Sequence, residues 1–183
     1  MLKFLQERQN LRVLDIGPTS SQNINFLTGL GHSVYMADLV HESLSGHWSL
    51  PPEEEGGEPK FNVSGFFEQN LNFGRREFDV VMLWNTLDYI PQGLVLPLIE
   101  HLRDVVLRDG LVLAVFHSKA TGPNTAFCRY HLTGSDMIEM QEAEPHPVQR
   151  VYTNRKIEEL FAQFSNSRFF LAKDNLYEVI LTR

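Results

Sequence analysis

Short apolar runs alternate with helical patterns along most of this 183-residue chain. Residues 78–83 form a continuous apolar run with a single acid, as expected for a strand that is buried on both faces of a sheet. Residues 11–16 form a similar short run, which Gly17 ends. Helical patterns follow both runs, and the longer one covers residues 91–108. Alternating strands and helices predict an α/β protein with a doubly wound, mostly parallel sheet.

The other predicted elements complete a single domain over residues 1–183. Ser20 or Ser21 is expected to cap the helix after Gly17, because a serine hydroxyl accepts a hydrogen bond from the first helical turn. Five further strands are predicted at residues 32–39, 61–67, 110–118, 168–174 and 176–183. A turn joins the last two strands, which predicts an antiparallel hairpin at the end of a seven-stranded sheet. Another capped helix is predicted at 153–166, whereas residues 119–150 show no clear pattern.

Composition and charge exclude several classes of function. The formal net charge is −7 and the basic residues are spread out, so we expect no nucleic-acid partner. No apolar run approaches the ~20 residues that span a bilayer, and the first residues lack the pattern of a signal peptide. The single cysteine, Cys128, excludes an intrachain disulfide and fits a reducing compartment. We therefore predict a cytoplasmic protein without membrane contact.

The histidines form no recognisable metal motif. No pair of histidine or cysteine residues has the spacing of a zinc site, so we expect no metal ion. Four histidines are expected on the surface instead: His41, His47, His101 and His146.

The stretch DIGPTSS, which ends the first strand, has features of a nucleotide-binding loop. Gly17 can take a positive φ and let a ligand approach the backbone, and the next helix offers unpaired N–H groups. Asp38 ends the second strand, where a carboxylate can accept hydrogen bonds from both hydroxyls of a ribose. The alternative is a strand followed by a capped turn, with Asp38 merely starting a loop.

Four stretches resemble, in order and spacing, the class I S-adenosylmethionine-dependent methyltransferases. They are VLDIGPTSSQNINFLTGLGHSVYMADL, LNFGRREFDVVMLWNTLDYIP, LRDGLVLAVFHS and VYTNRKIEELFAQF. The resemblance covers nearly the whole chain, from about residue 11 to the end. It implies a Rossmann-like, seven-stranded, mostly parallel sheet with a C-terminal antiparallel hairpin, and S-adenosylmethionine as the cofactor.

The resemblance implies roles for four residues of the loop. Asp15 and Gly17 match the acid and the first glycine of the family's cofactor loop. Thr19 and Ser21 stand where the second and third glycines usually lie, which narrows backbone freedom and adds side chains near the cofactor.

Five residues beyond the loop also match cofactor positions of the family. Asp38 matches the acid that holds the ribose hydroxyls, and Leu39 the apolar residue beside the adenine. Phe67 stands where an aspartate commonly contacts the adenine amino group. Trp84 and Asn85 occupy the end of the fourth strand, next to the methionine part of the cofactor.

Three residues are candidates for the chemistry. Methyl transfer from a sulfonium is an in-line displacement, in which alignment supplies much of the rate, and a base is needed only when the acceptor must lose a proton. His117 after the fifth strand, and Asp88 and Tyr89 after the fourth, are the catalytic candidates, because strand ends face the site. The alternatives are a hydrogen-bonded strand-end role for His117, and solvent-facing positions for Asp88 and Tyr89.

The function predicted from the sequence is methyl transfer from S-adenosylmethionine to an unidentified acceptor, expected to be a small molecule. The alternative is a catalytically inactive methyltransferase-like binding or scaffolding module, which the two replaced glycines and Phe67 favour. A nicotinamide-dependent oxidoreductase is a third alternative, but its pyrophosphate needs the glycines more and the closing hairpin does not suit that fold.

Overall fold

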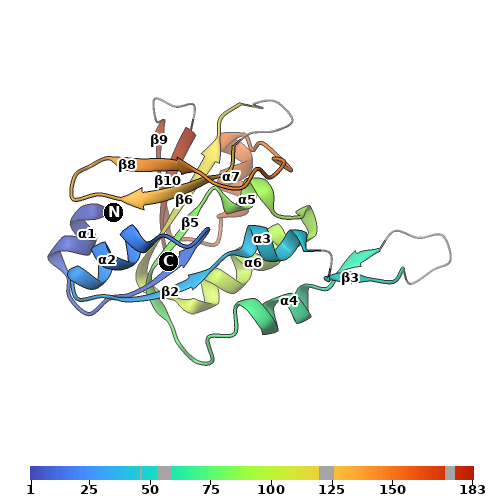
Figure 1. The fold of residues 1–183 in the computed structure, drawn as a ribbon, viewed down its shortest axis with the longest axis horizontal. Helices are drawn as coiled ribbons and strands as arrows, with labels where there is room; N and C mark the ends of the chain where they lie inside the picture. Colours follow the sequence, from blue (N-terminus) through green and yellow to red (C-terminus); the bar gives the residue numbers. More distant parts are fainter. Residues whose placement is uncertain (46, 53–58, 120–125, 172–175) are drawn as a thin grey trace.

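A central sheet organises the fold. The computed structural model describes residues 1–45, 47–52, 59–119, 126–171 and 176–183. The strands of its sheet are β1 (Arg12–Ile16), β2 (Ser33–Ala37), β5 (Phe78–Trp84), β6 (Val106–His117), β9 (Asn166–Leu171) and β10 (Leu176–Thr182). Within the described residues the order is β2-β1-β5-β6-β10-β9. The first four are parallel, and β10 is antiparallel to both of its neighbours (Figure 1).

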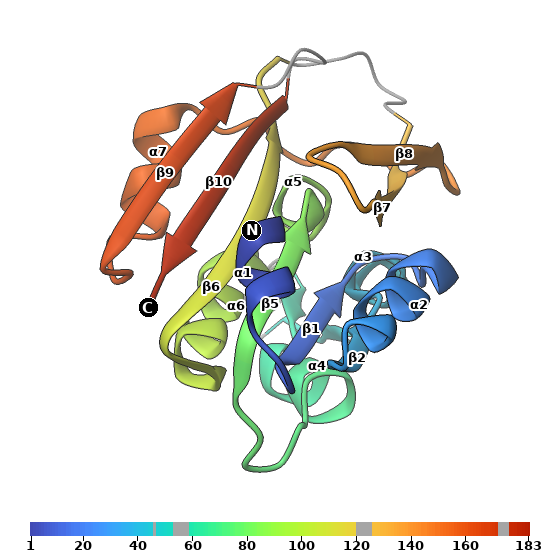
Figure 2. The same ribbon diagram turned by 90° about the vertical axis from the view of Figure 1, so that its left-hand side faces the viewer.

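Helices cover both faces of the sheet (Figure 2). The helices are α1 (Leu2–Glu7), α2 (Ser21–Gly29), α3 (Leu39–Leu44), α4 (Val63–Asn70), α5 (Thr86–Tyr89), α6 (Gln92–Val105) and α7 (Asn154–Leu160). The apolar residues of α1 and α2 belong to one buried cluster, and those of α3, α4, α6 and α7 belong to the cluster on the other face. The predicted doubly wound α/β architecture is therefore confirmed.

Strand β5 shows how the sequence produces two cores. Val81 and Leu83 point into the cluster of α3, α4, α6 and α7, whereas Val80, Met82 and Trp84 point into the cluster of α1 and α2. Successive side chains of a strand point to opposite faces, so a strand covered on both sides must be apolar throughout. The predicted buried strand at 78–83 is confirmed.

The third predicted strand is wrong, and within the described part of the chain the central sheet has six strands in place of the predicted seven. Of the predicted strand residues 61–67, Phe61 belongs to the two-residue strand β4 (Lys60–Phe61), and residues 63–67 form the start of α4. The Asn62 side chain begins this helix by accepting a hydrogen bond from the Gly65 backbone N–H at 3.1 Å. Phe66 then buries its ring against the core, so capping and helical spacing outweigh the strand preference of the phenylalanines. β4 pairs with β3 (Ser49–Leu50), and this hairpin projects from the body of the protein (Figure 1).

A second hairpin lies within residues 119–150, for which the sequence predicts no element. Strands β7 (Cys128–Leu132) and β8 (Ile138–Glu142) pair antiparallel. The hairpin lies near the ends of β5 and α5 and beside α2 (Figures 1 and 2). Residues 120–125 lie outside the described residues, so the start of this stretch is not characterised.

The predicted starts of two helices are confirmed, whereas the helix predicted at 153–166 ends at Leu160 and the strand predicted from residue 168 begins at Asn166. Ser20 caps α2 and Thr153 caps α7, each accepting a hydrogen bond from a backbone N–H three residues on. The C-terminal antiparallel hairpin of β9 and β10 is confirmed, although the predicted turn residues 173–175 lie outside the described residues. Among the described residues, no helix is both long and apolar enough to cross a membrane.

The boundary between α6 and β6 differs from the prediction. The helix ends at Val105, and Asp109 and Gly110 lie inside β6 in place of ending the helix. Asp109 takes a φ of 63°, and the pairing of β5 with β6 shifts register at this point. A Cβ at Gly110 would lie 2.7 Å from the Leu107 carbonyl oxygen, so only glycine fits here without backbone movement.

Replacement of Gly110 by alanine should lower the free energy of unfolding by about 1–3 kcal/mol, because the added methyl group meets backbone atoms. Gly93 of α6 is the matched control, since nothing lies within 4 Å of a Cβ at that position. Gly93→Ala should raise stability by up to ~1 kcal/mol through helix propensity. Urea denaturation of both variants checks this, and equal stability of Gly110→Ala and the wild type would contradict the packing described.

Candidate functional site

The site begins at the turn between β1 and α2. The Gly17 backbone N–H donates to the Ala37 carbonyl at 3.0 Å, which fixes the turn beside the end of β2. Gly17 does not have a positive φ, so the predicted reason for a glycine is wrong in this detail. The glycine is needed for a close approach, because a Cβ at Gly17 would lie 3.2 Å from Cδ1 of Trp84.

Asp15 forms the buried centre of this turn. Its Oδ1 accepts a hydrogen bond from Trp84 Nε1 at 2.6 Å, and its Oδ2 accepts one from Asn23 Nδ2 at 2.9 Å. Burial raises the pKa of Asp15 from 3.8 to about 6, and the two hydrogen bonds and the nearby His131 oppose this rise. The carboxylate therefore holds an indole in place and is not open to a ligand.

Asn23 extends this network from the turn to the β7–β8 hairpin. Its Nδ2 also donates to the Tyr130 carbonyl at 3.0 Å, and its Oδ1 accepts from the Leu132 N–H at 2.7 Å. Ser20 Oγ and His131 Nδ1 lie 2.7 Å apart and make a second link. A buried asparagine in α2 thus fixes a hairpin more than 100 positions away.

Trp84 lies directly over the glycine turn. Its indole stacks on the Tyr130 ring with 5.1 Å between centroids and 4° between planes. The residue has a φ of 45°, which is uncommon for a bulky side chain and is found most often at functional sites. The protein's own aromatic pair therefore occupies the space next to Gly17.

Thr19 and Ser21, which replace the two glycines, are exposed on the outer side of the turn. Both line an open groove of about 380 Å³ between α2 and the β7–β8 hairpin. Arg129, His131 and Gln141 line the opposite wall. The two hydroxyl side chains thus face a surface groove and do not crowd the space over Gly17.

Asp38 lies at the same edge of the sheet as Gly17, because the preceding residue, Ala37, accepts a hydrogen bond from the Gly17 backbone N–H. Asp38 is half-buried and its Oδ1 accepts a hydrogen bond from the His41 backbone N–H at 3.2 Å, which caps α3. No described residue donates a hydrogen bond to its Oδ2. This oxygen is thus open to a ligand hydroxyl.

Two predicted adenine contacts point elsewhere in this structure. Leu39 is fully buried in the core and offers no surface to a ligand. The Phe67 ring packs on His101 of α6 with 5.0 Å between centroids. His101 is consequently half-buried and not a surface residue as predicted, and its burial lowers its pKa.

The three catalytic candidates lie together at the ends of β5 and β6. Asp88 Oδ2 lies 2.7 Å from His117 Nδ1 and also accepts the His117 backbone N–H at 2.8 Å. Tyr89 packs edge-on against the His117 ring with 5.8 Å between centroids. Asp88 and Tyr89 have no exposed surface, so the alternative that they face solvent is wrong.

Burial and charge shift the pKa values of Asp88, Tyr89 and the neighbouring Tyr130. Burial raises the pKa of Asp88, and the contacts with His117 oppose this rise. Burial and the neighbouring Asp88 also raise the pKa of Tyr89, and burial raises that of Tyr130. Both phenols therefore keep their protons near neutral pH and are available as hydrogen-bond donors.

Several buried polar atoms at this edge lack a partner among the described residues. They are Asn85 Nδ2, Asp88 Oδ1, and the hydroxyls of Tyr89 and Tyr130. Buried polar groups are nearly always hydrogen-bonded in native proteins. These atoms gather at the ends of β5, α5 and β7, where they could form hydrogen bonds with a polar ligand.

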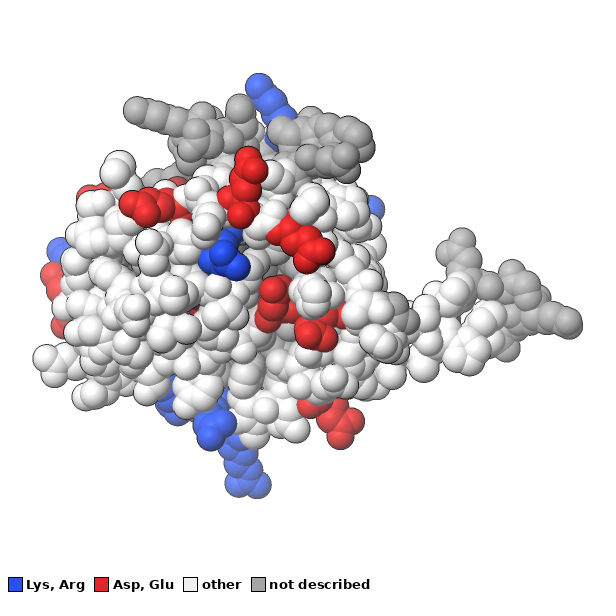
Figure 3. All heavy atoms as spheres, in the orientation of Figure 1, with Lys and Arg blue, Asp and Glu red and all other residues white. Residues whose placement is uncertain are grey.

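The charges of the surface are mixed. Figure 3 shows acidic side chains over the middle and upper part of one face, with scattered basic side chains among them and others along its lower edge. No extended basic surface is visible on this face of the described residues. The absence of a nucleic-acid partner remains a prediction.

The fold and this edge of the sheet define a class of protein. Residues 1–165 match a family model described as a methyltransferase domain, so the chain belongs to the methyltransferase domain family. This match confirms the resemblance to class I S-adenosylmethionine-dependent methyltransferases. No curated protein matches the sequence.

Solved structures show the same fold. An S-adenosylmethionine-dependent methyltransferase from Mesorhizobium loti is 14% identical, with a TM-score of 0.56, and the match covers 100% of this chain and 95% of that chain. A Methanosarcina mazei protein of the same class is 14% identical, with a TM-score of 0.56, and the match covers 100% of this chain and 96% of that chain.

A third structure was solved with its ligands. It is the 1,6-didemethyltoxoflavin-N1-methyltransferase of Burkholderia thailandensis with bound 1,6-didemethyltoxoflavin and S-adenosylhomocysteine. It is 15% identical, with a TM-score of 0.52, and the match covers 99% of this chain and 74% of that chain. The family and these neighbours support S-adenosylmethionine as the predicted cofactor.

The residues present fit the ribose of this cofactor. The space beside the Gly17 turn fits a ligand less well, because a side chain already lies there. Asp38 has a carboxylate oxygen that no described residue binds and that suits the hydroxyls, and the unpartnered Asn85 Nδ2 suits a polar group at the end of β5. The indole of Trp84 lies over Gly17, so entry of any group there requires the Trp84–Tyr130 stack to open.

The pKa of Asp15 is higher in the folded protein than in the unfolded chain. Its contribution to the free energy of unfolding is therefore fully present below pH 3.8 and is lost as the pH rises through about 6. A rise from 3.8 to about 6 corresponds to roughly 3 kcal/mol. Between pH 4 and pH 7 the wild type should therefore lose up to this much stability relative to Asp15→Asn. Urea denaturation of both proteins across this range checks it, and a constant difference would contradict the burial of Asp15.

Proposed function

We propose that this protein transfers a methyl group from S-adenosylmethionine to a small-molecule acceptor at the carboxyl edge of the sheet. The observation that best supports this is the buried Asp88–His117 pair, which lies beside unpartnered polar atoms of Asn85 and Tyr89. Membership of the methyltransferase domain family supports the reaction class. The bound small molecule of the Burkholderia thailandensis enzyme supports the acceptor class.

Asp38 would hold the cofactor by its ribose. Its Oδ1 caps α3, which fixes the carboxylate, and its Oδ2 would accept hydrogen bonds from the ribose hydroxyls. When bound, S-adenosylmethionine supplies an electrophilic methyl group and leaves as a thioether. The Gly17 turn, which is held to β2 by the Ala37 carbonyl, would lie beside the bound cofactor.

His117 would act as the base when the acceptor must lose a proton. His117 Nδ1 lies 2.7 Å from the Asp88 carboxylate, so the Nδ1–H tautomer would donate to Asp88 and leave Nε2 as the ring nitrogen that can take a proton. The same carboxylate stabilises the imidazolium that forms. Tyr89 would hold the imidazole ring in place by packing edge-on against it, and its buried hydroxyl keeps its own proton.

One observation favours a second candidate, the catalytically inactive binding module. The Trp84 indole covers Gly17 and is held by a buried carboxylate and by a stacked tyrosine. If this arrangement never opens, the site cannot take the cofactor. Measurement of S-adenosylhomocysteine binding to the wild type separates the two functions, because no heat at millimolar ligand would exclude the enzyme and leave the module.

Asp38→Ala should weaken binding of S-adenosylhomocysteine by about 10- to 100-fold, since hydrogen bonds to a charged group contribute ~1.5–3 kcal/mol. Asp38→Asn separates this effect from loss of the helix cap, because asparagine caps as well as aspartate. Asp104→Ala on the exposed side of α6 is the control for loss of charge. Calorimetry provides the affinities, and wild-type affinity in Asp38→Ala would overturn the ribose assignment.

His117→Ala should lower kcat by roughly 10²- to 10⁴-fold, as expected for loss of a general base, while cofactor binding stays unchanged. Release of S-adenosylhomocysteine can be screened with phenols, amines and thiols as acceptors. A base role also predicts that kcat of the wild type rises with pH to a plateau and that the variant loses this rise. An unchanged kcat would show that His117 serves only to hold α5 against β6.

A further inference from the structure

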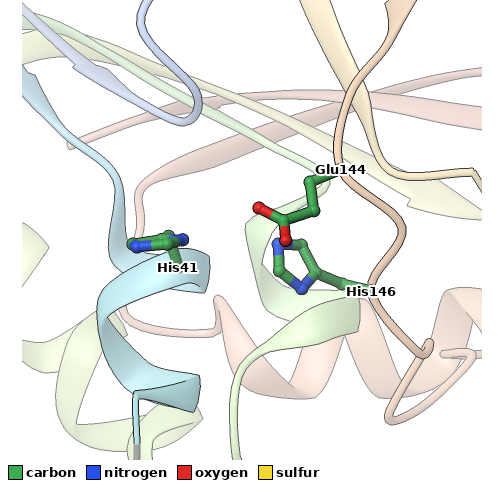
Figure 4. Close-up of side chains that lie close together, drawn as sticks. All are labelled: His41, Glu144 and His146. Carbon is green, nitrogen blue, oxygen red and sulfur yellow. The ribbon is translucent and has the colours of Figure 1, made fainter.

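Three potential metal ligands meet at the rim of the candidate site. His41 lies on α3, and Glu144 and His146 lie in the segment that follows β8 (Figure 4). Each residue contributes one ligand atom, and these atoms all lie within 4.8 Å of one another. The close-up shows the Glu144 carboxylate next to the His146 ring, with the His41 ring on the opposite side of the gap.

We propose that His41, Glu144 and His146 bind one divalent transition-metal ion of the zinc type. Two imidazole nitrogens and one carboxylate oxygen suit Zn²⁺, Co²⁺ or Ni²⁺, whereas Mg²⁺ and Ca²⁺ prefer oxygen ligands alone. Three protein ligands leave a coordination position open for water or another small ligand, as in catalytic zinc sites. This proposal does not depend on the methyltransferase activity.

Only small side-chain movements are needed to close the site. At metal–ligand distances near 2.1 Å, tetrahedral ligand atoms lie about 3.4 Å apart. His41 and Glu144 are exposed, so their rotamers can change without repacking the core. His146 is half-buried and its ring packs edge-on against Phe127 with 5.2 Å between centroids, which makes it the fixed ligand.

The backbones that hold the ligands are fixed independently of a metal ion. The Asp38 carboxylate accepts the His41 backbone N–H and so fixes the start of α3. On the other side, the Ala143 N–H donates to the Phe127 carbonyl at 2.7 Å, and the Gln149 N–H donates to the Asp88 carbonyl at 2.7 Å. Both ends of the segment that contains Glu144 and His146 are therefore attached to the body of the protein.

Charge also suits a cation. Glu144 forms no ion pair with a described basic residue, so its negative charge is not already compensated within the characterised part of the chain. The neighbouring Asp38 and Glu42 of the same edge add further negative potential. A divalent ion bound here would join α3 to the segment after β8, two parts of the chain that are distant in sequence.

The test uses the untagged full-length protein after treatment with a chelator. Calorimetry with Zn²⁺ should show one saturable equivalent, and Co²⁺ should produce the visible absorption of a tetrahedral or five-coordinate site. His146→Ala and His41→Ala should each weaken binding at least tenfold, and Glu144→Gln should also weaken it. Zn²⁺ should raise the Tm of the wild type and not that of His146→Ala.

His47→Ala is the matched control, because His47 is an exposed histidine that lies outside the cluster and contacts Ser45. It should bind Zn²⁺ like the wild type, and Mg²⁺ should produce no comparable heat. The proposal is overturned if binding does not saturate at one equivalent, if the three cluster variants bind like the wild type, or if His47→Ala loses affinity equally.

Discussion

The buried carboxylate of Asp15 is the interaction on which the candidate site depends. A carboxylate is stable away from water only when hydrogen bonds satisfy it, and here Trp84 and Asn23 supply them. Asn23 in turn holds the β7–β8 hairpin. A single acidic side chain at the end of β1 thus determines where an indole, a helix and a hairpin lie. Its loss would leave the indole N–H and an amide N–H in the core with one partner fewer.

The sheet was largely predictable from the sequence because burial on both faces imposes continuous apolar runs, as in residues 78–83. The third strand failed because Phe66 and Phe67 look like strand residues, while the Asn62 cap selects a helix. The β7–β8 hairpin could not be predicted, since its strands are mostly polar or exposed and are held by Asn23 at long range. Asn23 lies one helical turn before the buried Leu27 of α2, but one asparagine among the other polar residues of this helix is a weak signal.

The candidate site was predictable where the residues end strands. Asp38, Asp88 and His117 were identified because the carboxyl ends of parallel strands share one edge. The partner of Asp15 was not identifiable, because nothing in the sequence indicates that Trp84 turns back over Gly17. The cluster of His41, Glu144 and His146 was missed for a related reason. Metal motifs are recognised by short spacing, and these ligands come from separate parts of the chain.

The position of Trp84 has an optical consequence. The chain has two tryptophans, and both are buried. Trp48 hydrogen-bonds the Glu42 carbonyl in the α3–α4 region and does not touch the glycine turn. Trp84 stacks on a tyrosine and donates to a carboxylate, so its emission depends on that geometry. The protein therefore contains an intrinsic fluorophore whose signal reports the opening of the space over Gly17, with Trp48 as a nearly constant background.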